Sequence, residues 1–111
     1  MKWGLAIFCA IALQATVITA FSYNNLVNKF TCTYGGKPLY GKVKFVESLQ
    51  DIKVKVVTTS PDLRVKIVKD SPRRCGEWEI VDFLPDLKVQ FVETLTDIEI
   101  QFVEANPGVA Y

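Results

Sequence analysis

Lys42-Val-Lys-Phe-Val-Glu-Ser-Leu-Gln-Asp-Ile52 is followed directly by Lys53-Val-Lys-Val-Val-Thr-Thr-Ser-Pro-Asp-Leu63, which has the same pattern of residue types. Four more copies run over residues 64–76, 77–87, 88–98 and 99–109. Every copy has eleven residues except the third, which has thirteen because Arg73-Arg74-Cys75-Gly76 replaces the usual Asp-apolar ending. A short internal repeat of this kind determines the architecture. Residues 42–111 are therefore predicted to form one six-copy repeat domain.

Apolar and charged residues alternate across each boundary between copies, as in Ile52-Lys53-Val54-Lys55-Val56. The same alternation recurs at 63–67, 87–91 and 98–102. A period of two predicts half-buried strands with their charged side chains outward. An eleven-residue period also suits a right-handed helical supercoil. The alternation excludes it, as do the prolines within the copies, namely Pro61, Pro72, Pro85 and Pro107. The predicted fold class is all-β.

One valine in every copy follows an inward residue directly and so breaks the alternation. These residues are Val46, Val57, Val68, Val81, Val92 and Val103. Polar residues such as Glu47-Ser48 come next and are typical of a corner. Each copy is therefore predicted to be one strand and one corner. On periodicity alone, the copies would stack on their neighbours as a short β-solenoid.

Residues 1–22 have the layout of a secretory signal peptide. Lys2 supplies a positive charge, residues 4–19 are uncharged and mostly apolar, and the small residues Ala20 and Ser22 mark the cleavage region. A membrane anchor is the competing interpretation, because the apolar run approaches the length that spans a bilayer. No basic cluster follows Ser22, which favours cleavage and an exported protein, either periplasmic or extracellular.

Residues 23–41 differ from the repeats and are predicted to be a lead-in segment or cap. Residues 30–34 alternate as a short strand would, and Gly35-Gly36-Lys37-Pro38 signals a turn. Signal cleavage removes Cys9 and leaves Cys32 and Cys75. Two cysteines in a small exported domain predict one disulfide, which would tie the lead-in to the third copy. Two unpaired thiols are the alternative.

Charge and composition argue against several function classes. The sequence has 13 Lys+Arg against 12 Asp+Glu and no charged tail, so neither nucleic acid nor an anionic membrane is indicated as a partner. Histidine is absent, and with it the commonest general base and metal ligand. We therefore predict a non-enzymatic protein with no catalytic residue, no cofactor and no membrane association after signal cleavage.

An aspartate recurs just before four of the predicted strands, at Asp51, Asp62, Asp86 and Asp97. Carboxylates aligned by a repeat could bind calcium. The favoured interpretation is that each aspartate bonds its own backbone and shapes the turn, so no metal site is predicted. Trp78 is the second residue of its copy, a position that is valine in four of the other copies, and is predicted to pack in the core. Arg73-Arg74 is predicted to be a solvated loop.

The repeat resembles the septoil knot domain, the seven-crossing knotted family. The resemblance covers Leu39 to Tyr111 and rests on the eleven-residue copies, on Cys75-Gly76-Glu77-Trp78 after the lengthened copy, and on Asn106-Pro107-Gly108. It implies a small all-β domain whose chain winds repeatedly around itself into a knot. The Pro-Asp ending of the copies and Val109-Ala110-Tyr111 depart from many members, which suggests a divergent branch. No activity and no functional residue transfers.

The leading hypothesis is an exported structural or binding module with an unidentified protein partner and an undetermined oligomeric state. One alternative is a self-assembling surface or matrix protein that adds strands at an open edge. Another is a secreted ligand-binding or inhibitor module that uses its corner loops.

Overall fold

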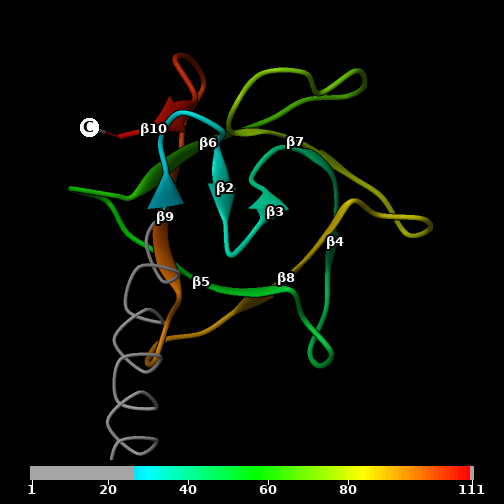
Figure 1. Ribbon diagram of the computed structural model, residues 1–111, viewed down its shortest axis with the longest axis horizontal. Helices are drawn as coiled ribbons and strands as arrows, with labels where there is room; N and C mark the ends of the chain where they lie inside the picture. Colours follow the sequence, from blue (N-terminus) through cyan, green and yellow to red (C-terminus); the bar gives the residue numbers. More distant parts are fainter. Residues whose placement is uncertain (1–26, 111) are drawn as a thin grey trace, which may run out of the picture.

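Six short strands, one for each copy of the repeat, dominate the structure, a computed structural model that describes residues 27–110 (Figure 1). They are β4 (Gly41–Phe45), β5 (Ile52–Val56), β6 (Leu63–Ile67), β7 (Glu77–Ile80), β8 (Leu87–Phe91) and β9 (Ile98–Phe102). The segments of alternating residues are thus confirmed as strands. The described residues contain no helix, and the all-β class is confirmed. The predicted signal peptide, residues 1–22, lies outside the described residues.

The six strands close into a parallel barrel. Their order around it is β4, β8, β5, β9, β6 and β7, and β7 pairs again with β4. A further strand, β10 (Gly108–Val109), runs antiparallel beside β6. The third residue of a barrel strand lies opposite the last residue of one neighbour and the first of the other, as Val54 lies opposite Phe91 and Ile98. Because each step around the ring shifts the register in this way, the strands tilt steeply across the barrel axis.

The alternation of side chains builds the core in layers. The first and third residues of the five-residue strands point inward and are buried, and the residues between them carry charged or amide groups outward. The middle layer is fully buried and comprises Val43, Val54, Val65, Trp78, Val89 and Ile100. β-Branched side chains suit this layer because they pack well on an enclosed, pleated surface. Trp78 packs in the core, as predicted.

Consecutive copies do not stack on one another, so the solenoid expected from periodicity alone is wrong. β4, β5 and β6 occupy every second place around the ring, and β8 and β9 fill the places between them. β7 follows β6 in the adjacent place, so the longer third copy advances the chain by one place instead of two. The chain therefore passes twice around the barrel, with its second pass interleaved with the first. Interleaving gives each of the six strands two neighbours, whereas a stack would leave exposed edges.

Four of the corners cross the outside of the strand that separates the two strands they join. Residues 46–51 run from β4 to β5 over β8, where the N–H of Val46 donates to the carbonyl of Val89 at 2.9 Å. At the other end of this corner, the N–H of Asp51 donates to the carbonyl of Lys88 at 2.9 Å. The five other recurring valines donate in the same way, to the carbonyls of Ile100, Trp78, Val43, Val54 and Val65. The repeated valine thus marks where the chain leaves a strand, as predicted.

The recurring aspartates fasten the far ends of these four corners. The carboxylate of Asp51 accepts from the N–H of Lys88 at 2.8 Å, so the two residues exchange two hydrogen bonds. The same exchange joins Asp62 to Glu99, Asp86 to Lys42 and Asp97 to Lys53. The prediction that each aspartate bonds its own backbone is therefore wrong. Interleaving brings a strand from a distant copy beside the turn, and the carboxylate takes an N–H of that strand instead.

The lead-in forms a small sheet of β1 (Val27–Asn28), β2 (Thr33–Tyr34) and β3 (Lys37–Pro38). Gly35 and Gly36 both have positive φ and make the tight hairpin between β2 and β3, as predicted. The strand expected over 30–34 is confirmed only at its end. The side-chain oxygen of Asn28 accepts from the N–H groups of Phe30 and Thr31, at 2.9 and 3.1 Å, and turns the chain there.

Candidate functional site: the open end of the barrel

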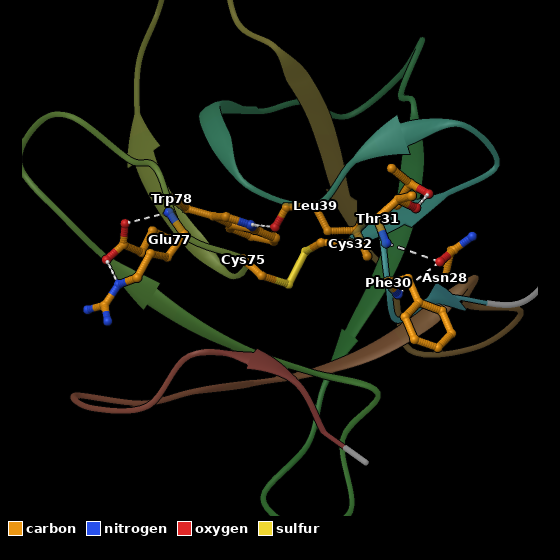
Figure 2. Close-up of a disulfide and its surroundings, with 10 residues drawn as sticks. Asn28, Phe30, Thr31, Cys32, Leu39, Cys75, Glu77 and Trp78 are labelled. Carbon is orange, nitrogen blue, oxygen red and sulfur yellow. Dashed lines mark hydrogen bonds and ion pairs between the residues drawn. A yellow bond between two sulfur atoms is a disulfide. The ribbon is translucent and has the colours of Figure 1, made fainter.

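One end of the barrel is closed by the lead-in. β2 and β3 lie over the opening of the ring in Figure 1. Leu39 is fully buried there, and its carbonyl accepts from the indole N–H of Trp78 at 3.1 Å (Figure 2). Partial burial, then the charge of Asp97 and its hydrogen bond with the phenol, raise the pKa of Tyr34. Asp97 lies in the corner between β8 and β9. The chain thus covers this end with its own residues.

A disulfide fixes the lead-in to the barrel. Cys32 and Cys75 are joined, with their Cα atoms 5.8 Å apart, as predicted from the sequence (Figure 2). Next to the bond, the carbonyl of Cys32 accepts from the N–H of Leu39 at 2.9 Å. Cys75 belongs to the lengthened third copy. The same connection therefore shifts the winding and carries the cross-link.

The opposite end of the barrel is open within the described part of the chain. The last inward residues of the six strands lie there and are 40–48% exposed. All are large and apolar, and we call them the open-end ring: Phe45, Val56, Ile67, Ile80, Phe91 and Phe102. Their counterparts two residues earlier are fully buried, so the exposure belongs to this end of the barrel. A contiguous apolar patch on a soluble domain often marks an interaction site.

Four aromatic rings form the floor of the open end. Phe45 meets Phe91 edge-on, with centroids 4.8 Å apart, and Trp78 meets Phe102 edge-on at 6.4 Å. Contacts of Phe45 with Trp78 at 6.4 Å and of Phe91 with Phe102 at 6.5 Å complete the cycle. Aromatic pairs in such geometries contribute about 0.5–1.5 kcal/mol beyond their burial. The floor is therefore apolar, and its rings pack against one another.

Two hollows lie beside the open-end ring at equivalent positions of the repeat. The larger, about 440 Å³, is lined by Phe45, Val46, Glu47, Gln90 and Phe91. The smaller, about 390 Å³, is lined by Lys66, Ile67, Phe102, Val103 and Glu104. Each lies where two neighbouring strands end and a corner begins, and each combines apolar walls with one carboxylate. Such hollows suit an apolar side chain or a small apolar ligand with a polar edge.

The corner tips hold a second set of exposed apolar residues, which the sequence reasoning missed. One residue in each tip has a positive φ, always at the same position of the repeat: Leu49, Ser60, Ser71, Leu84, Leu95 and Asn106. The three leucines are 85–89% exposed, and the adjacent Phe83 is 83% exposed. Ser-Pro and Asn-Pro in the other copies mark this position as a turn. That signal could have identified the leucines as exposed.

Arg73 and Arg74 lie in the connection between β6 and β7 and are exposed, as predicted. Their backbone N–H groups donate to Oε1 of Glu77, at 3.0 and 2.9 Å. The Arg74 guanidinium lies 3.4 Å from Oε2 of the same carboxylate. The hydrogen bonds from Arg74 and then Arg73 hold the pKa of Glu77 below its ordinary value. The carboxylate of Glu77 thereby organises this loop.

The carboxylate of each recurring aspartate accepts a hydrogen bond from a different strand of the barrel, so the four carboxylates do not gather at one place. Within residues 27–110, no group of three or more Cys, Asp or Glu side chains is arranged to hold a metal ion. The absence of catalytic residues, cofactors and metal sites stays a prediction from the sequence.

The sequence also matches a protein-family model. The model described as the 7(1) septoil knot domain matches residues 36–110. None of the curated proteins compared matches the chain. In the part of the chain that the structure describes, no helix has the length and apolar character needed to cross a membrane.

Proposed function

We propose that this chain, which belongs to the septoil knot domain family, is an exported, non-enzymatic module that binds a partner protein through the open end of its barrel. The family is named for its fold and not for an activity, so the function is inferred from the surface. One observation carries the proposal. The lead-in closes one end of the barrel, whereas six large apolar side chains remain 40–48% exposed at the other.

Exposure of the open-end ring leaves substantial binding free energy available. Full burial of one large apolar side chain contributes about 1.5–3 kcal/mol. Because each member is already about half buried, covering all six contributes on the order of 5 kcal/mol. This is enough for a specific contact once the polar rim of a partner adds hydrogen bonds, although association itself has an entropic cost. The rigid aromatic floor keeps the cost of ordering low.

Four features support an exported, non-enzymatic role. Residues 1–22 have the layout of a signal peptide, and a structural disulfide is typical of an oxidising compartment. The sequence has no histidine to activate a serine or threonine. The recurring carboxylates are occupied by backbone N–H groups that hold the corners in place.

Self-assembly by strand addition is less favoured. Each of the six barrel strands already has a neighbour on both sides, so the barrel offers no free edge for an added strand. The open end and its hollows, in contrast, favour capture of an apolar group.

Titration with the apolar dye anilinonaphthalene sulfonate tests the site. The dye fluoresces when it binds exposed apolar side chains, and Phe102 belongs to the open-end ring. We expect Phe102→Gln to weaken dye binding at least about tenfold. Phe83→Gln is the matched control, because Phe83 is more exposed but lies in a corner. Equal effects of the two substitutions, in variants of equal stability, would contradict the proposal.

A further inference from the structure

The three corner leucines are neighbours around the barrel, although they are distant in sequence. Leu84, Leu49 and Leu95 lie at the tips of the corners that cross β4, β8 and β5, respectively. These three strands are consecutive in the ring. The other three tips, beside β9, β6 and β7, carry serine or asparagine instead. We call the surface over β4, β8 and β5 the leucine half; Figure 1 shows the corners projecting outward from the ring.

Leucine is poorly suited to these tips on local grounds. The φ angles of Leu49, Leu84 and Leu95 are 57°, 52° and 55°, in the left-handed region. This conformation costs a residue with a side chain about 1–2 kcal/mol, and asparagine tolerates it better. Because the leucines are 85–89% exposed, burial against the described residues does not offset that cost. Residues that break a local preference without an internal compensation are expected at functional sites.

The leucine half also carries charges of both signs. Its strands turn five lysines outward: Lys42, Lys44, Lys53, Lys55 and Lys88. Besides the aspartate that fastens it, each of its corners carries one further acidic residue: Glu47, Asp82 or Glu93. Asp51, at the end of one of these corners, pairs with Lys37 of the lead-in at 3.6 Å. The five lysines and these three further acids have no ion pair within the described residues 27–110.

We propose that the leucine half is the contact surface of a dimer formed with a second copy of this chain. A two-fold arrangement presents the lysines of each copy to the corner acids of the other, so both sets of charges pair at once. The leucine tips of each copy can then contact the aliphatic stems of the lysines of the other.

Other occupants fit this surface less well. Insertion of the leucine tips into a bilayer would carry the corner acids in beside them, at a high energetic cost. A partner with charges of one sign is repelled either by the lysines or by the acids. Charges of both signs on one surface favour a self-complementary contact.

Sedimentation velocity tests the proposal on oxidised protein purified from its export compartment, over ~1 µM to ~1 mM, where protein dimers of moderate affinity dissociate. We expect a dimer for the wild type. The triple variant L49N/L84N/L95N should raise the dimer dissociation constant at least about tenfold. Its thermal midpoint should stay equal or rise, because asparagine relieves the left-handed strain. The matched control S60N/S71N changes the same repeat position on the other half and should keep the dimer.

Three results would overturn the proposal. The first is a wild type that stays monomeric at the highest concentration. The second is a triple variant that dimerises as tightly as the wild type, or a control that loses the dimer equally. The third is a monomeric wild type that sediments with phosphatidylcholine vesicles while the triple variant does not, which would assign the leucines to lipid. Weakening of the dimer by added salt would support the paired charges.

Discussion

Removal of the Cys32–Cys75 disulfide is expected to lower the free energy of unfolding by about 4 kcal/mol, from the chain-entropy estimate for a loop of this length. The bond spans a sequence separation of 43 residues, so the reduced unfolded chain has many more conformations than the oxidised one. The folded state should change little. Leu39 remains buried without the bond, and its carbonyl still accepts from the indole of Trp78.

Equilibrium urea unfolding, followed by the fluorescence of Trp78, measures this effect. The oxidised protein is compared with the reduced protein and with C32A/C75A, which separates loss of the bond from loss of the thiols. With a denaturant slope of about 1–3 kcal/mol per molar, the midpoint should fall by more than about 1 M. A fall in stability below about 1 kcal/mol would refute the reasoning, because the unfolded chain would then be constrained by something other than the disulfide.

Four further outcomes are expected. Asp62→Ala removes the acceptor of a β9 N–H and should cost about 1–2 kcal/mol of unfolding free energy in urea, whereas Asp70→Ala, at an exposed tip, should change it by less than about 0.5 kcal/mol. Gly76→Ala should cost clearly more than Gly35→Ala, which carries only the left-handed penalty of about 1–2 kcal/mol; a Cβ at Gly76 (φ 84°) would collide with the backbone of β6 and β10, but one at Gly35 (φ 58°) meets open space. The fold lowers the pKa of Glu77, so the ionised carboxylate stabilises the folded state at a pH above its ordinary pKa of 4.5. This stabilisation is lost as the pH falls through the lowered pKa of the folded state, so Glu77→Gln should flatten the acid side of a stability–pH curve. Refolding should take on the order of seconds or longer, because distant strands must interleave before stabilising contacts form; stopped-flow refolding that finishes in milliseconds would contradict the interleaved winding.

The strands and the cross-link could be predicted from the sequence because their signals are local. The alternation in Ile52-Lys53-Val54-Lys55-Val56 reports which face of a strand is buried, and the structure has a strand over these residues. The valine after each strand marks a corner for a similar reason. Cys32 and Cys75 form a disulfide, as predicted.

The order of the strands could not be predicted, because all six copies present nearly the same pattern and any copy could pair with any other. The hydrogen-bond partners of the aspartates depend on that order. From the sequence alone, the carboxylate of Asp51 is therefore expected to bond its own turn, whereas its partner is the N–H of Lys88. The open end of the barrel could not be predicted from the sequence either. Phe45 and Val43 lie two residues apart on the inward face of the same strand, so the sequence predicts burial of both. Phe45 is exposed because the lead-in covers only the other end of the barrel.

Site-specific photocrosslinking in cells that produce the protein naturally tests the open-end site most directly. The photoreactive residue benzoylphenylalanine would replace Phe102 in the open-end ring or, as a control, Thr59 in a polar corner outside the leucine half. We expect one defined adduct with a different protein at position 102, suppressed by an excess of wild-type protein, and none at position 59. No adduct at position 102, or the same adducts at both positions, would contradict binding at the open end of the barrel.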